Sequence, residues 1–300
     1  MKILILGANG QAGRELARVL ASVGTVAAWD RASADLEDLP GLAGKVRAAA
    51  ADVIVNAAAY TAVDRAESEP DRAFRVNAEA VGILAGCARE SGAWLVHYST
   101  DYVFDGTSDR PYAETDAAHP LNVYGRSKLA GEESVRASGC RHLIFRTSWV
   151  FAPRGQNFVS TILRLAADKE LLRIVRDQIG APTSARLIGE VTRRALESID
   201  QTPCPEGTYH VAARGEASWH EYACFIVEEA RRLGYKMRVG PDRIMPVPTS
   251  DYPQPAARPA NSRLNTGKLE SWLGIALPAW QTEVARAIGE IVSERPNHDA

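Results

Sequence analysis

The segment Lys2-Ile3-Leu4-Ile5-Leu6-Gly7-Ala8-Asn9-Gly10-Gln11-Ala12-Gly13 decides the fold of this chain. An apolar run comes first, three glycines follow at intervals of three residues, and a helical pattern with Leu16, Leu20 and Val23 comes next. Strand, glycine turn and helix in this order are the context that a dinucleotide-binding fingerprint requires. We therefore predict a dinucleotide site at residues 7–13; an ordinary glycine-rich turn is the alternative.

The residues of this turn have separate roles in the predicted site. Gly7 allows the tight turn, Gly10 lets the backbone come close to a pyrophosphate, and Gly13 lets the helix pack on the strand. Gln11 and Ala12 open the helix, whose free N–H groups favour negative charge. All five are therefore candidate cofactor-binding residues.

Two residues after the second predicted strand, residues 26–29, bear on the choice of coenzyme. Asp30 lies twenty residues after the second glycine of the turn, about where an acid accepts the adenosine ribose hydroxyls and favours NADH. Arg31 could instead pair with the 2′-phosphate of NADPH, or it is a solvated loop charge. NADPH and NADH therefore both stay open. Asp35 and Leu36, in the next loop, could flank the adenine.

Apolar strand patterns alternate with helical patterns through the first half of the chain. Further strands are predicted at residues 52–56, 94–99 and 142–149. This alternation predicts an α/β fold with a Rossmann-type, doubly wound parallel sheet. Beyond Pro153 the alternation fades. We therefore expect a dinucleotide-binding domain at 1–152, completed by part of 172–205, and a smaller, mixed α/β C-terminal substrate domain at 153–300 that is interleaved with the first.

Two further segments have compositions that suit a ligand. Ala57-Ala58-Ala59-Tyr60-Thr61 follows the third strand, and small side chains there let a flat cofactor lie close. Arg258-Pro259-Ala260-Asn261-Ser262-Arg263 carries two guanidinium groups with amide and hydroxyl neighbours, which suit a diphosphate or a nucleotide. For the second segment, the alternative is a helix-capping loop with salt bridges.

Tyr124 and Lys128 form a candidate catalytic pair. They are four residues apart, so on a helix they share one face. A phenol ordinarily titrates near pH ~10, and a fixed ammonium beside it lowers that pKa, so Tyr124 could donate a proton near neutral pH. Thr100 ends the apolar strand 94–99 at the sheet edge where open α/β folds bind ligands. The pair alone is weak evidence, because a surface helix with a solvated lysine has the same spacing.

The length and composition are those of a globular protein: the chain has 300 residues, of which 46% are hydrophobic and 24% charged, and a net charge of −2. No basic surplus is present to bind nucleic acid, and the longest apolar runs are shorter than the ~20 residues that span a bilayer. The four cysteines, Cys87, Cys140, Cys204 and Cys224, form no Cys-x-x-Cys pair and fit reduced thiols. We therefore expect a cytoplasmic protein without nucleic-acid or membrane partners.

Together these residues resemble the extended short-chain dehydrogenase/reductase superfamily, through the glycine turn, Asn56-Ala57-Ala58, Thr100 and Tyr124-x-x-x-Lys128. Within it the chain resembles the dTDP-4-dehydrorhamnose reductases. The segments that narrow the resemblance are Ala59-Tyr60-Thr61-Ala62-Val63-Asp64, Tyr98-Ser99-Thr100-Asp101-Tyr102-Val103-Phe104, Pro120-Leu121-Asn122-Val123-Tyr124-Gly125, Phe145-Arg146-Thr147-Ser148-Trp149-Val150, Asp177-Gln178-x-Gly180-Ala181-Pro182-Thr183 and Arg258-Pro259-x-Asn261-Ser262-Arg263-Leu264.

The resemblance implies an NAD(P)H-dependent oxidoreductase that reduces the C4 ketone of dTDP-4-dehydro-6-deoxy-L-mannose to dTDP-L-rhamnose. Tyr124 would protonate the forming alkoxide, Lys128 would hold the nicotinamide ribose and lower the tyrosine pKa, and Thr100 would hydrogen-bond the same oxygen. The resemblance adds Ala59, Tyr60, Thr61, Tyr124 and Lys128 to the cofactor-binding residues. The substrate-binding residues that it implies are Val63, Thr100, Asp101, Tyr102, Trp149, Arg258, Asn261 and Arg263.

Two other enzyme activities, a regulatory role without catalysis and a homodimer all stay open. A 4,6-dehydratase would need a second acid where Tyr102 follows Asp101, whereas a 4-epimerase is separated from a reductase only by consumption of NAD(P)H. A regulatory subunit like the β subunit of methionine adenosyltransferase also resembles this family. Some members are thought to dimerise around magnesium at carboxylates, but Arg186 stands where an acid is expected. We predict no metal and leave a homodimer open.

Overall fold

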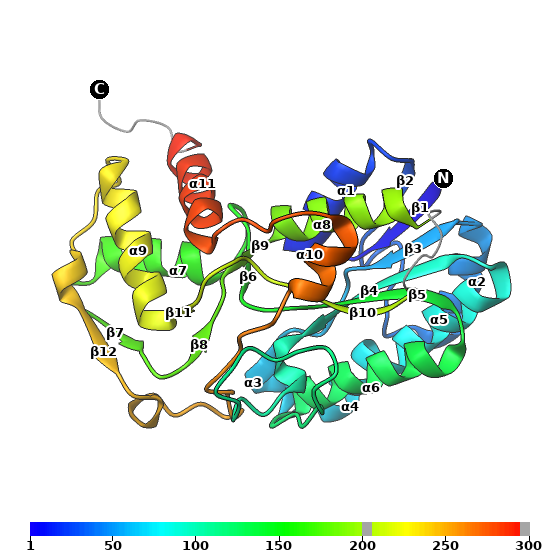
Figure 1. Cartoon of the computed structure of the whole chain (residues 1–300), viewed down its shortest axis with the longest axis horizontal. Helices are drawn as coiled ribbons and strands as arrows, with labels where there is room; N and C mark the ends of the chain where they lie inside the picture. The colour runs from blue at the N-terminus through cyan, green and yellow to red at the C-terminus, as the bar shows by residue number, and fades with distance from the viewer. Residues whose placement is uncertain (200–205, 295–300) are drawn as a thin grey trace.

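A six-stranded parallel sheet organises the molecule in the computed structural model, which describes residues 1–199 and 206–294 (Figure 1). Its strands, in the order β10-β5-β4-β3-β1-β2, are β1 (Lys2–Leu6), β2 (Thr25–Trp29), β3 (Val53–Asn56), β4 (Trp94–Thr100), β5 (Arg141–Thr147) and β10 (Gly207–Val211). All neighbouring pairs are parallel. The strand order reverses between β1 and β3, which makes the sheet doubly wound and confirms the predicted fold class.

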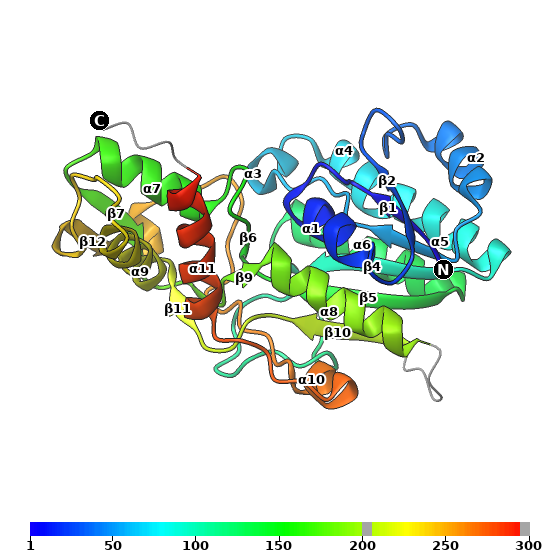
Figure 2. The ribbon, with the colours of Figure 1, turned by 90° about the horizontal axis from the view of Figure 1, so that it is seen from above.

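Helices cover both faces of this sheet, and the strand sequences explain why. Side chains alternate between the faces of a strand, so a strand covered on both sides needs a continuous apolar run. In β1, Ile3 and Ile5 pack with α1 (Gln11–Leu20) and α8 (Ala185–Ser198), whereas Leu4 and Leu6 pack with α2 (Leu39–Ala49) and α5 (Ala80–Ser91). Figure 2 shows α1 and α8 side by side on the first face.

Short helices and α6 complete the second face. They are α3 (Val63–Ala66), α4 (Pro70–Phe74), the π-helix η1 (Arg75–Glu79), the 3₁₀ helix η2 (Asp101–Val103) and α6 (Val123–Ser138). Asn122 caps α6 by accepting a hydrogen bond from the Gly125 backbone N–H at 2.8 Å. A Cβ at Gly125 would lie 2.2 Å from the Tyr102 carbonyl oxygen, and one at Gly131 would lie 2.1 Å from the Asn77 carbonyl oxygen. Only glycine therefore lets α6 lie this close to its neighbours.

The remaining chain forms a smaller region at the other end of the molecule (Figure 1). Helix α10 (Gly267–Leu273) packs beside β10 and α8 of the large sheet. The elements of the smaller region are β6 (Val150–Phe151), α7 (Phe158–Asp168), β7 (Leu172–Val175), β8 (Ile179–Gly180), β9 (Thr183–Ser184), β11 (Ala217–Ser218), α9 (Trp219–Arg232), η3 (Pro241–Arg243), β12 (Ile244–Val247), η4 (Thr249–Asp251) and α11 (Trp280–Ser293). Here β7 pairs with β12, β8 with β11 and β6 with β9, and α9 packs against α7 and α11. Between these elements the chain returns to the large sheet with α8 and β10. Each helix in the described part of the chain is too short or too polar to cross a lipid bilayer. Of the four cysteines, Cys204 lies outside the described residues.

A buried ion pair joins α6 to β5. Arg146 donates from Nε to Glu132 Oε1 at 2.8 Å and from Nη2 to Oε2 at 2.7 Å, and both side chains are buried. Burial by itself raises the pKa of Glu132, but the hydrogen bonds and charge of Arg146 hold that pKa below its ordinary value. The second cation on Glu132, Arg136, is largely solvated at 40% side-chain exposure.

We predict that Glu132→Gln lowers the free energy of unfolding by about 3 kcal/mol or more, because it leaves the Arg146 guanidinium buried without its counter-charge. Urea denaturation followed by circular dichroism measures the change. Arg136→Gln is the matched control and should cost no more than about 1 kcal/mol, because the Arg136 guanidinium is partly solvated and Glu132 keeps its buried partner Arg146. Equal losses in the two variants would contradict this account.

Candidate active site

A cleft of about 800 Å³ opens at the carboxyl ends of the sheet strands and receives most of the predicted site residues. The predicted residues that line it are Gly7, Gly10, Gln11, Ala12, Asp30, Arg31, Asp35, Leu36, Ala59, Tyr60, Thr61, Val63, Thr100, Asp101, Tyr102, Tyr124, Lys128 and Trp149. Gly13 is buried behind the lining, in α1. One continuous cleft therefore joins the glycine turn to the tyrosine–lysine pair.

The glycine turn has the shape that a pyrophosphate needs. Gly7 has a φ of +80°, and a Cβ there would lie 2.7 Å from the Ala58 backbone nitrogen. A Cβ at Gly13 would lie 2.1 Å from the Gly7 carbonyl oxygen. Helix α1 begins at Gln11 after Gly10, which has no side chain to cap the first N–H groups. Those groups are free to bind an anion at the positive end of the helix, so the turn fits a dinucleotide.

Asp30 is held at the tip of β2. Its Oδ1 accepts hydrogen bonds from the Ser33 backbone N–H and hydroxyl at 3.0 Å, and its Oδ2 accepts one from Asn9 Nδ2 at 3.1 Å. The backbone hydrogen bond from Ser33 is the main cause that lowers the pKa of Asp30. This fixed carboxylate suits the hydroxyls of a ribose.

Tyr124, Thr100 and Asp101 meet at the other end of the cleft. Burial raises the pKa of Tyr124 to about 12, against the opposing effect of a hydrogen bond with Thr100. The Thr100 hydroxyl donates to Asp101 Oδ1 at 3.0 Å and accepts from the Tyr102 backbone N–H at 3.2 Å. The Tyr124 ring stands edge-on to the Tyr102 ring at 5.8 Å. Tyr124 therefore holds its proton at neutral pH beside a second hydroxyl.

The surroundings of Lys128 correct one expectation. Its ammonium is buried, donates to the Tyr98 carbonyl at 2.6 Å and lies 3.2 Å from His97 Nε2. Burial lowers the pKa of Lys128 to about 8. The prediction that Lys128 lowers the pKa of Tyr124 is wrong for this structure, because the ammonium is directed to the Tyr98 carbonyl while burial and Asp101 raise the tyrosine pKa.

Comparison with known proteins agrees with this geometry. A family model described as the RmlD substrate binding domain matches residues 1–293. A dTDP-4-dehydrorhamnose reductase from Burkholderia thailandensis is 49% identical over 98% of this chain and 100% of its own length. Another from Escherichia coli K12 is 48% identical over 97% of this chain and 98% of its own. The chain belongs to the dTDP-4-dehydrorhamnose reductase family.

The fold of a solved member supports the assignment. The crystal structure of a dTDP-4-dehydrorhamnose reductase from Bacillus anthracis in complex with NADP superposes with a TM-score of 0.88 at 33% identity, covering 96% of this chain and 99% of that chain. The family resemblance inferred from the sequence motifs is therefore confirmed.

Within this family fold, the structure adds cleft residues that the sequence did not indicate. Trp219, at the start of α9, stacks on Trp149 with ring centroids 3.6 Å apart and an interplanar angle of 12°. Trp149 has a φ of +46°, rare for a bulky residue. Ser218 and Glu221 form a capping box that fixes where α9 begins. Glu37 and Arg72 also line the cleft, and no sequence motif marked them.

Three predicted substrate residues do not line the cleft. Arg258 pairs with Asp64 at 2.8 Å, Arg263 pairs with Glu216 at 2.9 Å, and Asn261 donates to the carbonyls of Ser108 and Arg110 at 2.9 Å. These contacts match the alternative of a loop held by salt bridges. The segment reaches the site at Ser262, which lies close enough to the Asp101 carboxyl to lower its pKa. Direct substrate contact by Arg258, Asn261 and Arg263 stays a prediction.

The absence of a metal also stays a prediction. Among residues 1–199 and 206–294, no three histidine, cysteine, aspartate or glutamate side chains come together as a metal site requires.

We expect the Asp101 carboxyl to titrate with a pKa of about 6, because burial disfavours its ionised form. Carboxyl ¹³C NMR of the ligand-free protein, with Asp101→Asn for assignment, measures this value. Asp105 is the matched control, because the Thr107 backbone N–H lowers its pKa below the ordinary range. If Asp101 titrates together with Asp105, its carboxyl is not desolvated in solution.

Proposed function

We propose that this chain catalyses the NAD(P)H-dependent reduction of the C4 ketone of dTDP-4-dehydro-6-deoxy-L-mannose, which yields dTDP-L-rhamnose. The observation that carries the proposal is the single cleft that joins a dinucleotide-binding turn to a protonated tyrosine. The activity for which the relatives described above are named supports the choice of substrate. The reaction consumes NAD(P)H, which agrees with a cytoplasmic site of action.

The coenzyme end of the site follows from the cleft lining. Gly7, Gly10, Gln11 and Ala12 would bind the pyrophosphate, with Gly13 supporting the turn from behind. Asp30 would bind the adenosine ribose, and Lys128 the nicotinamide ribose. The residues proposed to flank the adenine and the rest of the coenzyme are Arg31, Asp35, Leu36, Ala59, Tyr60 and Thr61. When bound, NADH or NADPH supplies the hydride.

The proton comes from Tyr124. Its pKa of about 12 keeps the phenol protonated at neutral pH, yet an alkoxide is a stronger base than a phenolate, so transfer to the substrate oxygen is downhill. With substrate bound, the Thr100 hydroxyl would turn its proton from Asp101 to the same oxygen and orient it. Lys128, whose ammonium is directed to the Tyr98 carbonyl, would contribute by holding the nicotinamide ribose and not by lowering the tyrosine pKa. Asp101, where ionised, disfavours that phenolate and promotes return of a proton from solvent.

The sugar end of the site draws on both halves of the chain. Val63, Asp101, Tyr102 and Trp149 would contact the sugar, and Trp149 is held by its stack on Trp219. We propose that residues 1–152 mainly bind the coenzyme and residues 153–300 mainly bind the nucleotide sugar. A homodimer stays open, and the family resemblance alone suggests it.

Absorbance at 340 nm tests the function. Purified protein is mixed with NADH or NADPH and with dTDP-4-dehydrorhamnose made in situ by a 4,6-dehydratase and a 3,5-epimerase. We expect a loss of absorbance that requires both this protein and the complete substrate mixture. No loss with either coenzyme, from folded protein that still binds one, would refute the reductase and favour an epimerase or a regulatory subunit.

Tyr124→Phe should lower kcat by about 100-fold or more, because it removes the proton donor, while the dissociation constant of the coenzyme stays within about twofold. Stopped-flow turnover and fluorescence titration with NADPH measure the two effects. Tyr112→Phe is the matched control: its hydroxyl binds Asp105 away from the cleft, so kcat should be retained. Near-normal turnover by Tyr124→Phe would exclude this tyrosine as the donor.

Activity should decline as the pH rises through about 8. Lys128 carries its charge below that pKa and loses it above, so coenzyme binding weakens on the alkaline side. A pH profile of kcat/KM from pH 6 to pH 10 measures the decline. Lys128→Arg keeps the charge and should move this limb to higher pH, whereas Lys128→Met should lower the whole profile. An unchanged alkaline limb in Lys128→Arg would count against the lysine.

A further inference from the structure

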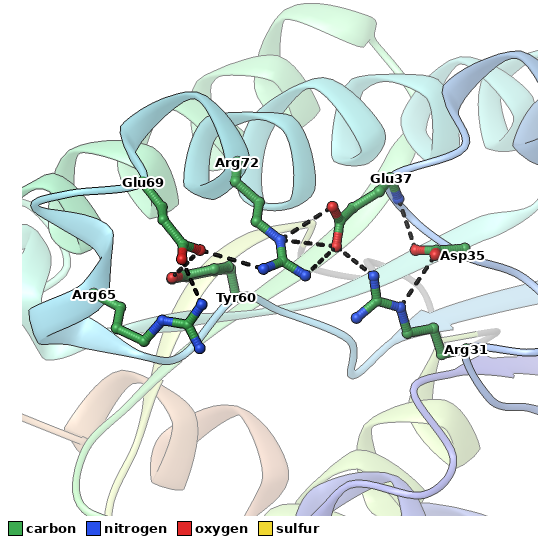
Figure 3. A network of polar contacts seen from close by, with 7 residues as sticks. All are labelled: Arg31, Asp35, Glu37, Tyr60, Arg65, Glu69 and Arg72. Atoms are coloured by element: carbon green, nitrogen blue, oxygen red, sulfur yellow. Dashed lines mark hydrogen bonds and ion pairs between the residues drawn. The ribbon is translucent and has the colours of Figure 1, made fainter.

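A network of charged side chains lies at the adenosine end of the cleft (Figure 3). Its members, in order across the network, are Asp35, Arg31, Glu37, Arg72, Glu69, Tyr60 and Arg65. Arg31, Glu37 and Arg72 line the cleft, whereas Glu69 and Arg65 lie outside its lining. A ligand in the cleft can therefore reach Arg31, Glu37 and Arg72, but it does not face Glu69 or Arg65.

Glu37 is the bridge of this network. Its Oε1 accepts from Arg31 Nη2 at 2.5 Å and from Arg72 Nη2 at 2.9 Å, and Arg72 Nε donates to both of its oxygens at 3.0 and 3.1 Å. Arg31 also donates from Nε to Asp35 Oδ2 at 3.1 Å. One carboxylate thus holds two guanidinium groups, and Arg31 is held by two carboxylates.

The position of Arg31 gives this arrangement a consequence for the coenzyme. Arg31 directly follows Asp30 at the end of β2, where the 2′ substituent of the adenosine ribose lies when a dinucleotide binds this fold. A guanidinium there suits the phosphate of NADPH, because the two groups can form paired, charge-assisted hydrogen bonds. In this structure Glu37 and Asp35 already accept those hydrogen bonds. A 2′-phosphate that pairs with the Nε and Nη2 edge of Arg31 must therefore compete with Glu37 and Asp35, whereas the free hydroxyl of NADH leaves the network intact.

We propose that Glu37 sets the choice between NADPH and NADH by occupying the guanidinium of Arg31, and that Arg72 is the second cation that allows Glu37 to release it. This inference rests on the proposed function only in so far as the cleft binds a dinucleotide. When a phosphate binds Arg31, Glu37 keeps its hydrogen bonds to Arg72 and is not left as an unpaired charge. Without Arg72, Glu37 keeps only Arg31 as a guanidinium partner among the described residues. Glu37 then competes more strongly with the phosphate for Arg31.

The charge balance supports this competition. Arg31, Arg72 and Arg65 are matched by Asp35, Glu37 and Glu69, and Asp30 adds a further negative charge at the same end. The network has no surplus positive charge to attract a dianion. Neutralising Glu37 would create that surplus next to Arg31. Arg31 is 64% exposed, so the gain should be moderate and should fall with added salt.

The test measures dissociation constants of NADPH and NADH by nicotinamide fluorescence, with no nucleotide sugar present. Glu37→Gln should bind NADPH about tenfold more tightly, as expected for one charge-assisted hydrogen bond freed at a partly exposed site. NADH binding should change less than about twofold. Arg72→Gln should have the opposite sign and weaken NADPH binding about tenfold with little effect on NADH. Raising the salt concentration from 50 to 500 mM should reduce both selective effects.

Two matched controls separate this role from a general structural one. Glu69→Gln removes the carboxylate on the side of Arg72 away from the cleft, and Arg65→Gln removes a network arginine that does not line the cleft. Both should leave the NADPH-to-NADH affinity ratio unchanged. Titration with 2′,5′-ADP and with ADP repeats the comparison without the nicotinamide half.

Equal changes for the two coenzymes in Glu37→Gln and Arg72→Gln would overturn the proposal, as would the same shift in Glu69→Gln. Because the readout is binding and not turnover, wild-type protein that binds coenzyme but reduces no nucleotide sugar would refute the proposed function alone. Wild-type protein that is folded but binds neither coenzyme would overturn both.

Discussion

The close contact between α6 and the parallel sheet is the constraint on which the active site depends. Helix α6 carries Tyr124 and Lys128, and it reaches its position because Gly125 and Gly131 replace side chains that would collide with backbone carbonyls. The buried pair of Glu132 and Arg146 then ties α6 to β5. A buried ion pair is weak evidence for net stability, but it penalises any register of the helix that would separate the charges. This constraint helps to hold the proton donor Tyr124 in position, and misplacement of a catalytic group by about 1 Å can greatly slow a reaction.

Removal from water explains the electrostatics of the reacting end. Burial is the largest cause of each shift there: the pKa of Tyr124 rises to about 12, that of Asp101 rises to about 6, and that of Lys128 falls to about 8. All three shifts favour the uncharged form, which is the direction that desolvation imposes. Interactions with a developing charge are stronger in such a site than in water. The dry end of the cleft is therefore suited to stabilise an oxyanion and to supply a proton.

The adenosine end of the cleft works by a different principle. Its side chains are exposed or half-exposed, and its arginines and carboxylates neutralise one another in a chain of ion pairs. Each exposed pair contributes little to folding. The same pairs can still decide between ligands that differ by one phosphate, because discrimination depends only on the difference between two binding free energies. Chemistry and coenzyme selection are thus separated in space along one cleft.

Local sequence patterns by themselves determined the parallel α/β class, the glycine turn and the Tyr124–Lys128 face, because each depends on neighbours within a few residues. Strand β12 was not predicted, since Pro246 is unusual in a strand and is tolerated only because β12 pairs with β7 alone. Only the tertiary structure decided that Trp219 stacks on Trp149, that Arg72 reaches Glu37 and that Arg258 pairs with Asp64. The partners in these contacts lie tens of residues or more apart, and side-chain types alone do not reveal which distant groups folding brings together. The tertiary structure also decided the raised pKa of Tyr124, because burial sets that pKa and the spacing of the motif does not.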